Sequence, residues 1–397
     1  MTCSTGVSRW QWSCNRNLRL DKIRKHRLAI RNFEFLCGET LDVEISYETY
    51  GRLNESADNA ILICHFWTGT SHAAGKYTAE DPLPGWWDAL IGPGKTIDTN
   101  LNYVICTDTL SNVQANDPMV SSTGPASIDP RTGKPFGSRF PTLTFRDIVQ
   151  AQRALIDQLG IRHLKAVGGP SGGGMQALEW AVTYPDFMDK VFAVNSFGRS
   201  SAFFTMAVYR MCRALIEADP CWQNGDYYDG PGPQTGFHHA LSYITLMAQS
   251  PTRINSVARG SDVGWQVLEQ ISQLNEPDRL SLYEQDFSLF IEDRASFADA
   301  NAFLTIGKAA TLHDVGLGRG GFEQALSTVQ AEVLMIPNEQ DIYFPAIDSR
   351  DVVDAIKAGN GNAECYPVDS QWGHFACLFD TGTFAQRLQQ FLLKGPG

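Results

Sequence analysis

The stretch Leu164-Lys165-Ala166-Val167-Gly168-Gly169-Pro170-Ser171-Gly172-Gly173-Gly174-Met175 decides the fold of this chain. A mostly apolar run, typical of a buried strand, leads into a Gly-x-Ser-x-Gly motif, and a helical pattern follows at once. In this context the serine sits at a sharp turn, where Gly169 and Gly173 avoid Cβ clashes with the neighbouring strand and helix. The free N–H groups at the start of the helix favour a developing oxyanion. We therefore interpret the motif as a nucleophile elbow that exposes the hydroxyl of Ser171, rather than as a glycine-rich turn.

Strand and helix patterns alternate on both sides of this motif. An apolar/polar alternation over 28–50 predicts an antiparallel hairpin around 37–40. Short apolar runs bounded by turn residues are typical of parallel strands buried on both faces. They occupy 60–64, 103–106, 164–167, 191–194 and 333–336, and helical patterns occupy 145–159, 174–183 and 346–358. The alternation predicts an α/β protein with a mostly parallel sheet.

Residues 198–312 break this alternation. Helix-like stretches lie at 202–218, 237–248 and 265–274, and a loop rich in Gly, Pro and aromatic residues spans 221–236. We expect a helical cap inserted into a core formed by 28–197 and 313–397. Residues 1–27 form a basic arm with seven Lys and Arg against one acid. We interpret the arm as a frayed leader, with an organelle transit peptide as the alternative.

The composition excludes several classes of function. The chain has 397 residues, with 32 Lys and Arg against 44 Asp and Glu and a formal net charge of −12, which argues against general nucleic-acid binding. No apolar run approaches the ~18–20 residues of a membrane helix. Nine scattered cysteines without a Cys-x-x-Cys pair indicate a reducing compartment. His238-His239 lacks the spacing of a metal site, and 92–96 only imitates the end of a phosphate-binding loop. We expect a cytoplasmic protein with no bound metal or cofactor and no nucleic-acid or membrane partner.

A nucleophilic serine needs a base and an acid that orients the base. In the elbow fold these partners follow in the order Ser, acid, His. Asp341 lies on a loop just after the apolar run 333–336, and His374 lies on a late glycine-containing loop. We predict that His374 takes the serine proton and that Asp341 holds the imidazole tautomer. Glu339 is the rival for the acid.

The oxyanion formed at the serine needs two N–H donors. The residue after the nucleophile supplies one, and a loop after an early strand supplies the other. We assign these donors to the backbones of Gly172 and Trp67. His65 and His72, near the second donor, are expected to be structural rather than catalytic.

Four further strings of sequence resemble the homoserine O-acetyltransferases. They are residues 61–73 (ILICHFWTGTSHA), the loop around 85–99, 122–127 (STGPAS) and 173–186 (GGMQALEWAVTYPD). The resemblance runs from about residue 28 to the C-terminus. It implies an α/β-hydrolase core, a helical cap and a double displacement through an acyl-serine. It also implies acetyl-CoA as acyl donor, an amino-acid hydroxyl as acceptor, and a homodimer formed through the cap.

The chain departs from the family where the amino acid would bind. The family's catalytic His is usually followed by Asp, placed to meet the amine of homoserine, but here Phe375 follows and offers an apolar wall. The family's carboxylate-binding Arg matches Arg213 best, with Arg210 as a rival, and only part of the cap motif is kept at 297–303. We therefore predict a carboxylesterase acting on short-chain acyl esters. The alternative is an O-acetyltransferase that uses acetyl-CoA and acts on homoserine or another alcohol, and a third possibility is a non-catalytic binding module.

Overall fold

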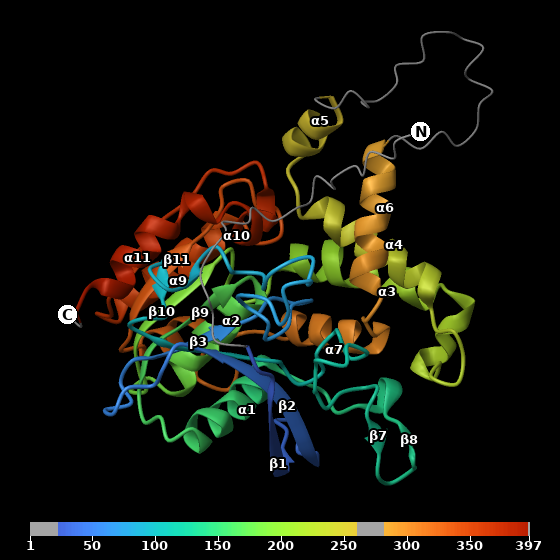
Figure 1. Ribbon diagram of the computed structural model, residues 1–397, viewed down its shortest axis with the longest axis horizontal. Helices are drawn as coiled ribbons and strands as arrows, with labels where there is room; N and C mark the ends of the chain where they lie inside the picture. The colour runs from blue at the N-terminus through green and yellow to red at the C-terminus, as the bar shows by residue number, and fades with distance from the viewer. Residues whose placement is uncertain (1–22, 260–281, 396–397) are drawn as a thin grey trace.

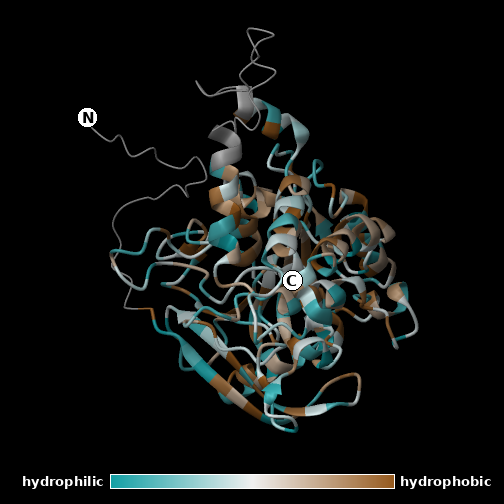
Figure 2. Ribbon diagram, turned by 90° about the vertical axis from the view of Figure 1, so that its right-hand side faces the viewer, coloured by the Kyte–Doolittle hydropathy of each residue, from teal (hydrophilic) through white to brown (hydrophobic). Residues whose placement is uncertain are grey.

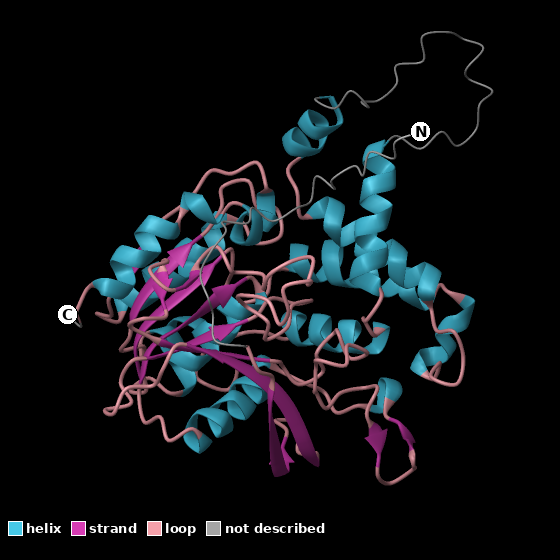
Figure 3. Cartoon of the chain, viewed as in Figure 1, coloured by secondary structure: helices cyan, strands magenta, loops and turns pink. Residues whose placement is uncertain are grey.

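The computed structural model describes residues 23–259 and 282–395, and its centre is an eight-stranded sheet in the order β1-β2-β6-β3-β9-β10-β11-β12 (Figures 1 and 3). From β6 onward in this order the strands are parallel, whereas β2 pairs antiparallel with both β1 and β6. The strands are β1 His26–Glu34, β2 Thr40–Tyr50, β3 Ala60–Cys64, β6 Tyr103–Thr107, β9 Leu164–Pro170, β10 Met188–Val194, β11 Glu332–Ile336 and β12 Ala363–Cys365. The predicted hairpin and parallel strands are confirmed, and the short β12 was not predicted.

Helices flank this sheet (Figure 3). The central one, α2, is buried over nearly its whole length because it follows the elbow directly beneath the strand ends. α1 begins at a capping box, in which the Thr144 side chain accepts from the N–H of Asp147 and the Asp147 carboxylate accepts from the N–H of Thr144. These helices are α1 Phe145–Gln158, α2 Gly172–Thr183, α8 Phe322–Leu326, α9 Ala346–Ala358, α10 Ala376–Phe379 and α11 Ala385–Leu393.

A second group of helices lies between β10 and β11 in the sequence and gathers to one side of the sheet (Figure 1). An antiparallel bridge joins Arg199 to Asp314, so the two ends of this insertion lie side by side. The expected helix at 265–274 lies outside the described residues. The helices of the insertion are the π-helical η2 Phe204–Tyr209, α3 Arg210–Glu217, α4 Gln234–Met247, α5 Pro251–Arg259, α6 Leu282–Ala295 and α7 Ala300–Thr311.

Several shorter elements complete the described chain. Two small two-stranded sheets consist of β4 Ile91–Gly92 with β5 Ile97–Asp98 and of β7 Ile128–Asp129 with β8 Lys134–Pro135. The 3-10 turns are η1 Gly137–Arg139, η3 Pro220–Gly225, η5 Gly373–Phe375 and η6 Thr381–Thr383. Polar and apolar residues alternate along many of the elements (Figure 2). Among residues 23–259 and 282–395, no helix is long and apolar enough to cross a membrane.

The folded core starts earlier than the boundary at residue 28 that the charge pattern suggested. β1 begins at His26, and Lys25 is almost fully buried. Its ammonium group lies 3.1 Å from Glu48 Oε1 and 3.2 Å from Asp108 Oδ2, and both carboxylates are fully buried. Lys25 is therefore an internal cation rather than part of a basic arm, because two buried carboxylates need a counter-charge.

Candidate active site

Ser171 sits at the turn between β9 and α2 with φ 55° and ψ −121°, a conformation that costs energy for a residue with a Cβ atom. The glycines on either side allow this turn. A Cβ atom at Gly169 would lie 2.1 Å from the carbonyl oxygen of Cys64, and one at Gly173 would lie 2.0 Å from the same oxygen. The clashes expected from the Gly-x-Ser-x-Gly spacing are confirmed, with the end of β3 as the neighbour.

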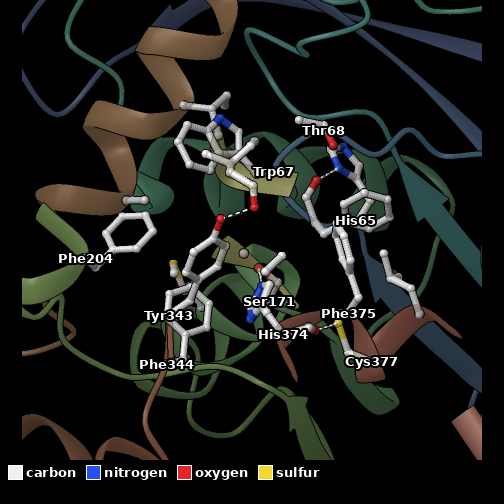
Figure 4. Close-up of a pocket in the computed structure, with 18 of the residues that line it drawn as sticks. His65, Trp67, Thr68, Ser171, Phe204, Tyr343, Phe344, His374, Phe375 and Cys377 are labelled. Carbon is white, nitrogen blue, oxygen red and sulfur yellow. Dashed lines mark hydrogen bonds between the residues drawn. The ribbon is translucent and has the colours of Figure 1, made fainter. Parts of the chain in front are cut away.

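A continuous chain of hydrogen bonds joins Ser171, His374 and Asp341. Nε2 of His374 lies 2.8 Å from Oγ of Ser171, and Nδ1 lies 2.7 Å from Oδ2 of Asp341. Figure 4 shows Ser171 and His374 side by side at the pocket. The other oxygen of Asp341 accepts from the N–H groups of Tyr343 at 2.8 Å and Phe344 at 3.1 Å, so the carboxylate is held from both ends.

Asp341 and His374, which follow Ser171 in the sequence, both come from loops at the strand ends. Asp341 follows β11, and His374 lies in η5, where its backbone oxygen accepts from Nδ2 of Asn195 at 2.9 Å. The rival acid, Glu339, points away and pairs with Arg350 at the surface. The structure therefore brings together the three residues that the sequence order selected.

The backbone nitrogen of Trp67 lies close to Gly172, the residue that follows the serine. A Cβ atom built on Gly172 would be 3.5 Å from the Trp67 nitrogen. In the described part of the chain, neither N–H donates to another backbone carbonyl. The Trp67 indole also stacks on Phe303 of α7 with centroids 4.4 Å apart and donates to the Phe303 carbonyl oxygen at 3.1 Å. The loop that carries one predicted oxyanion donor is thus fixed to the insertion.

The His65 ring fixes the same loop from the other side. Nε2 accepts from the backbone N–H of Thr109 at 3.1 Å, so the ring proton resides on Nδ1, which lies 2.7 Å from the carbonyl oxygen of Phe66. Burial lowers the pKa of His65, which favours this neutral form. These contacts are structural, as expected for His65. His72 likewise contacts Glu48 outside the pocket, with Nδ1 3.0 Å from Oε2.

The pocket in front of Ser171 is mostly apolar and aromatic (Figure 4). Phe375 lies in this lining, as the sequence analysis expected, and it is 8% exposed. No Asp or Glu occurs among the described residues of the lining, whereas Arg294 supplies a guanidinium. The lining comprises His65, Phe66, Trp67, Thr68, Thr109, Phe145, Ser171, Gly172, Met175, Gln176, Phe204, Ile244, Ala248, Arg294, Ile306, Ala310, Tyr343, Phe344, His374, Phe375, Cys377 and Leu378.

Arg213, the expected carboxylate-binding residue, does not reach this pocket. It lies on the exposed face of α3 and its Nε donates to Glu217 one turn later, at 2.7 Å. Arg210, its rival, is also exposed. Sequence reasoning missed Arg294 because nothing in its neighbourhood marks it, and only the packing of α6 shows that it faces the cavity.

The cap motif at 297–303 has a structural role. The side chain of Asp299 caps α7 by accepting from the N–H of Ala302, and it also accepts from the hydroxyl of Tyr227 at 2.7 Å. Asn301 donates to the carbonyl oxygen of Gly225 at 2.8 Å. These contacts tie α7 to the loop before α4 and lie outside the pocket lining. Among the residues that the structure describes, no group of three or more His, Cys, Asp and Glu side chains could hold a metal ion.

A mostly parallel sheet between helices, with a serine at this strand-to-helix turn, defines the α/β-hydrolase superfamily, and the chain is a member of it. No protein-family model matches the chain. Relatives nevertheless narrow the class. A homoserine O-acetyltransferase of Symbiobacterium thermophilum is 40% identical over 359 residues, which cover 88% of this chain and 89% of the relative. Another from Deferribacter desulfuricans is 37% identical over 91% of this chain and 93% of its own.

Solved structures agree with these relatives. A homoserine O-acetyltransferase from Bacillus anthracis superposes with a TM-score of 0.88 at 37% identity, covering 95% of this chain and all of its own. Esterase E22 superposes with a TM-score of 0.87 at 36% identity, covering 93% of this chain and all of its own. The chain belongs to the homoserine O-acetyltransferase family, which confirms the resemblance. It is an enzyme of the acyltransferase and esterase type, and its relatives favour the transferase over the esterase that the sequence analysis placed first.

Proposed function

We propose that this enzyme transfers a short acyl group through an ester formed on Oγ of Ser171. His374 takes the proton of Ser171 as Oγ attacks the acyl carbonyl, and the N–H groups of Trp67 and Gly172 stabilise the oxyanion. The protonated His374 then donates to the leaving group, and Asp341 keeps the imidazole in the tautomer that this requires. The observation that carries the proposal is the unbroken Ser171–His374–Asp341 hydrogen-bond chain at the wall of an apolar pocket.

In the second half of the reaction, His374 would deprotonate an acceptor that attacks the acyl-serine. We propose homoserine as this acceptor and acetyl-CoA as the acyl donor, because the homoserine O-acetyltransferases among the relatives match about nine-tenths of the chain. Acetyl-CoA is a substrate in this scheme and not a bound cofactor. The acylated acceptor then leaves, and His374 returns the proton to Oγ of Ser171.

A specific observation favours a second candidate, the hydrolysis of short-chain acyl esters. The pocket lining presents Phe375 and no described carboxylate, so the ammonium group of homoserine meets an apolar wall. Losing such a charge contact in a desolvated site costs ~2–5 kcal/mol. Water would then compete well for the acyl-serine. The similarity to esterase E22 is consistent with this candidate.

One experiment tests the acyl-serine and separates the two candidates. The purified enzyme and its Ser171→Ala variant are given acetyl-CoA, or p-nitrophenyl acetate, with increasing homoserine. Free acetate and O-acetylhomoserine are then quantified. We expect the Ser171→Ala variant to form neither product above background, and activity retained by it would refute the mechanism. O-acetylhomoserine as the main product identifies the transferase, and acetate as the main product at high homoserine identifies the esterase.

We also propose that the enzyme forms a homodimer through its helical insertion. Large apolar side chains are exposed directly before η2 and on η2, α3, α4 and α6, where they would be covered by a second copy. They are Phe203, Met206, Met211, Leu246 and Leu289, each between 39% and 63% exposed. Light scattering on the purified protein tests this proposal. A monomer at micromolar concentration would refute it, and Met206→Glu should dissociate a dimer.

A further inference from the structure

Arg294 places a positive charge in a cavity whose lining is otherwise mostly apolar. It belongs to α6 of the insertion and lines the same pocket as Ser171 and His374. Most of the other residues that line the pocket are aromatic or aliphatic. A charge in such surroundings is costly unless a partner of opposite charge offsets the desolvation.

Among the residues that the structure describes, the hydrogen-bond acceptors of Arg294 are neutral threonine hydroxyls. Nη1 donates to Oγ1 of Thr245 at 2.7 Å, and Nη2 donates to Oγ1 of Thr68 at 3.0 Å. Thr245 belongs to α4, and Thr68 directly follows Trp67. Within residues 23–259 and 282–395, no Asp or Glu forms an ion pair with Arg294. Its remaining N–H groups are available to a ligand, since a guanidinium has five donors.

The guanidinium nevertheless stays charged at neutral pH. Burial lowers the pKa of Arg294 to about 10, which is still well above neutrality. A planar guanidinium with free N–H groups is suited to bidentate binding of a carboxylate. The contact to Thr68 joins this group to the loop that carries the Trp67 donor, at the residue after Trp67.

We propose that Arg294 binds a carboxylate on the alcohol part of the substrate, and that the pocket recognises this carboxylate without recognising an ammonium group. The first half follows from a guanidinium that forms no ion pair with a described Asp or Glu, and the second from the absence of Asp and Glu in the described lining. The inference rests on the proposed acyl transfer at Ser171, because that reaction places the alcohol in this pocket. The substrate class is therefore a hydroxy acid or its acyl ester, for which an amino group adds little.

Binding to a protein that cannot react tests this inference separately from catalysis. Calorimetric titrations use the Ser171→Ala protein with 4-hydroxybutanoate, with homoserine, and with 1-butanol as the neutral alcohol. Arg294→Met and Arg294→Lys are each added to this background. The matched control is Arg213→Met, which removes an exposed arginine paired with Glu217. Thermal unfolding of each protein checks that it is folded.

We expect 4-hydroxybutanoate and homoserine to bind with similar Kd values, and both more tightly than 1-butanol. Arg294→Met should raise the Kd of both carboxylates about 30-fold, the equivalent of ~2 kcal/mol, and should leave 1-butanol unchanged. Arg294→Lys should recover part of the loss, and Arg213→Met should change nothing. Carboxylates that bind no better than 1-butanol, or lose affinity equally in Arg213→Met, would overturn the role of Arg294. Homoserine binding far more tightly than 4-hydroxybutanoate would overturn the second half. Neither result bears on acyl transfer, which the Ser171→Ala activity assay tests.

Discussion

The Nδ1 atom of His65 lies 2.7 Å from the carbonyl oxygen of Phe66, and this oxygen belongs to the peptide unit that carries the N–H of Trp67. The C=O and N–H of a trans peptide point in opposite directions within one plane. By holding the oxygen, His65 therefore sets the direction of the proposed oxyanion donor. The N–H of Gly69 donates to the same oxygen at 3.0 Å and adds a second restraint.

We expect His65→Ala to lower kcat about 10- to 100-fold while KM changes little, because the donor acts mainly on the transition state. Steady-state kinetics with p-nitrophenyl acetate measures both constants. His163→Ala is the matched control, since His163 pairs with Asp189 at the surface, and it should retain full activity. A loss confined to KM, or an equal loss in the control, would contradict the positioning role of His65.

Replacing the acid behind His374 should disable the enzyme without unfolding it. We expect Asp341→Asn to lower kcat by up to ~10⁴-fold, because an amide no longer selects the tautomer that accepts the serine proton. Glu339→Gln, only two residues away but paired with Arg350, should change kcat by less than about twofold. A burst assay with p-nitrophenyl acetate compares acylation in the two variants. Equal activity in both would mean that the acid has been assigned wrongly.

The carbonyl oxygen of Cys64 explains why two positions near Ser171 must be glycine. We expect Gly173→Ala to lower the free energy of unfolding by about 1–3 kcal/mol or more, because the new methyl group would meet that oxygen at 2.0 Å. Gly172→Ala is the control, since its methyl group would find its nearest neighbour at 3.5 Å. Urea denaturation compares the two, and similar midpoints would argue against the tight approach of β3 and α2.

The buried cluster of Lys25, Glu48 and Asp108 should make stability depend on pH. We expect Lys25→Met to lower the free energy of unfolding by ~3–5 kcal/mol near neutral pH, because two carboxylates lose their cation. Arg27→Met is the control and should cost under ~1 kcal/mol, since Arg27 is exposed and lies 3.8 Å from Glu44.

The pH window follows from the direction of two shifts in the native state. Burial opposes the charge of Lys25, yet Asp108 and Glu48 raise its pKa above the usual 10.5. Burial likewise opposes the charge of Glu48, yet the bond to His72 and the charge of Lys25 lower its pKa below 4.5. The pair therefore contributes its full stabilisation between the ordinary pKa values of 4.5 and 10.5. This stabilisation is lost as pH falls through the native pKa of Glu48 or rises through the native pKa of Lys25. The deficit of Lys25→Met should shrink in acid, and a deficit constant down to the acid transition would refute the ion pair.

Phe375 should decide between transfer to homoserine and hydrolysis. We expect Phe375→Asp to raise the ratio of O-acetylhomoserine to acetate by roughly 30-fold or more, since a carboxylate in the lining can pair with the ammonium group. Phe375→Leu controls for the lost ring, which packs edge-on against Phe379 at 5.5 Å. Product analysis from acetyl-CoA measures the ratio. An equal ratio in the two variants would show that residue 375 does not contact the acceptor.

The parallel strands and the elbow were predictable because local patterns encode them. Continuous apolar runs such as 60–64 can bury the side chains of both strand faces only inside a sheet. The glycines two residues before and after Ser171 are needed because the strand-to-helix turn leaves no room for a Cβ atom at these positions. The order Ser171, Asp341, His374 follows from the topology, since each residue lies on the connection that follows a strand. The three-residue β12 carries too little apolar pattern, with Glu364 exposed, to be recognised in sequence.

The arginine in the pocket was not predictable, for a different reason. Arg213 and Arg294 both lie on cap helices, and a helical pattern does not say which face another helix will cover. α3 turns Arg213 toward Glu217, whereas α6 packs on α4 so that Arg294 meets Thr245. The burial of Lys25 was not predictable either, because its two buried partners are 23 and 83 residues away in sequence.

β10 and β11 are hydrogen-bonded neighbours, with Val194 opposite Ile336, although the whole helical insertion separates them in the chain. The insertion therefore leaves the pairing of the two strands uninterrupted. The helices of the insertion can therefore be lengthened, repacked or exchanged while the strand pairing of the core is preserved. Ser171, Asp341 and His374 belong to the core, whereas Arg294 belongs to the insertion. New substrate preferences can thus evolve, or be engineered, without rebuilding the reactive machinery.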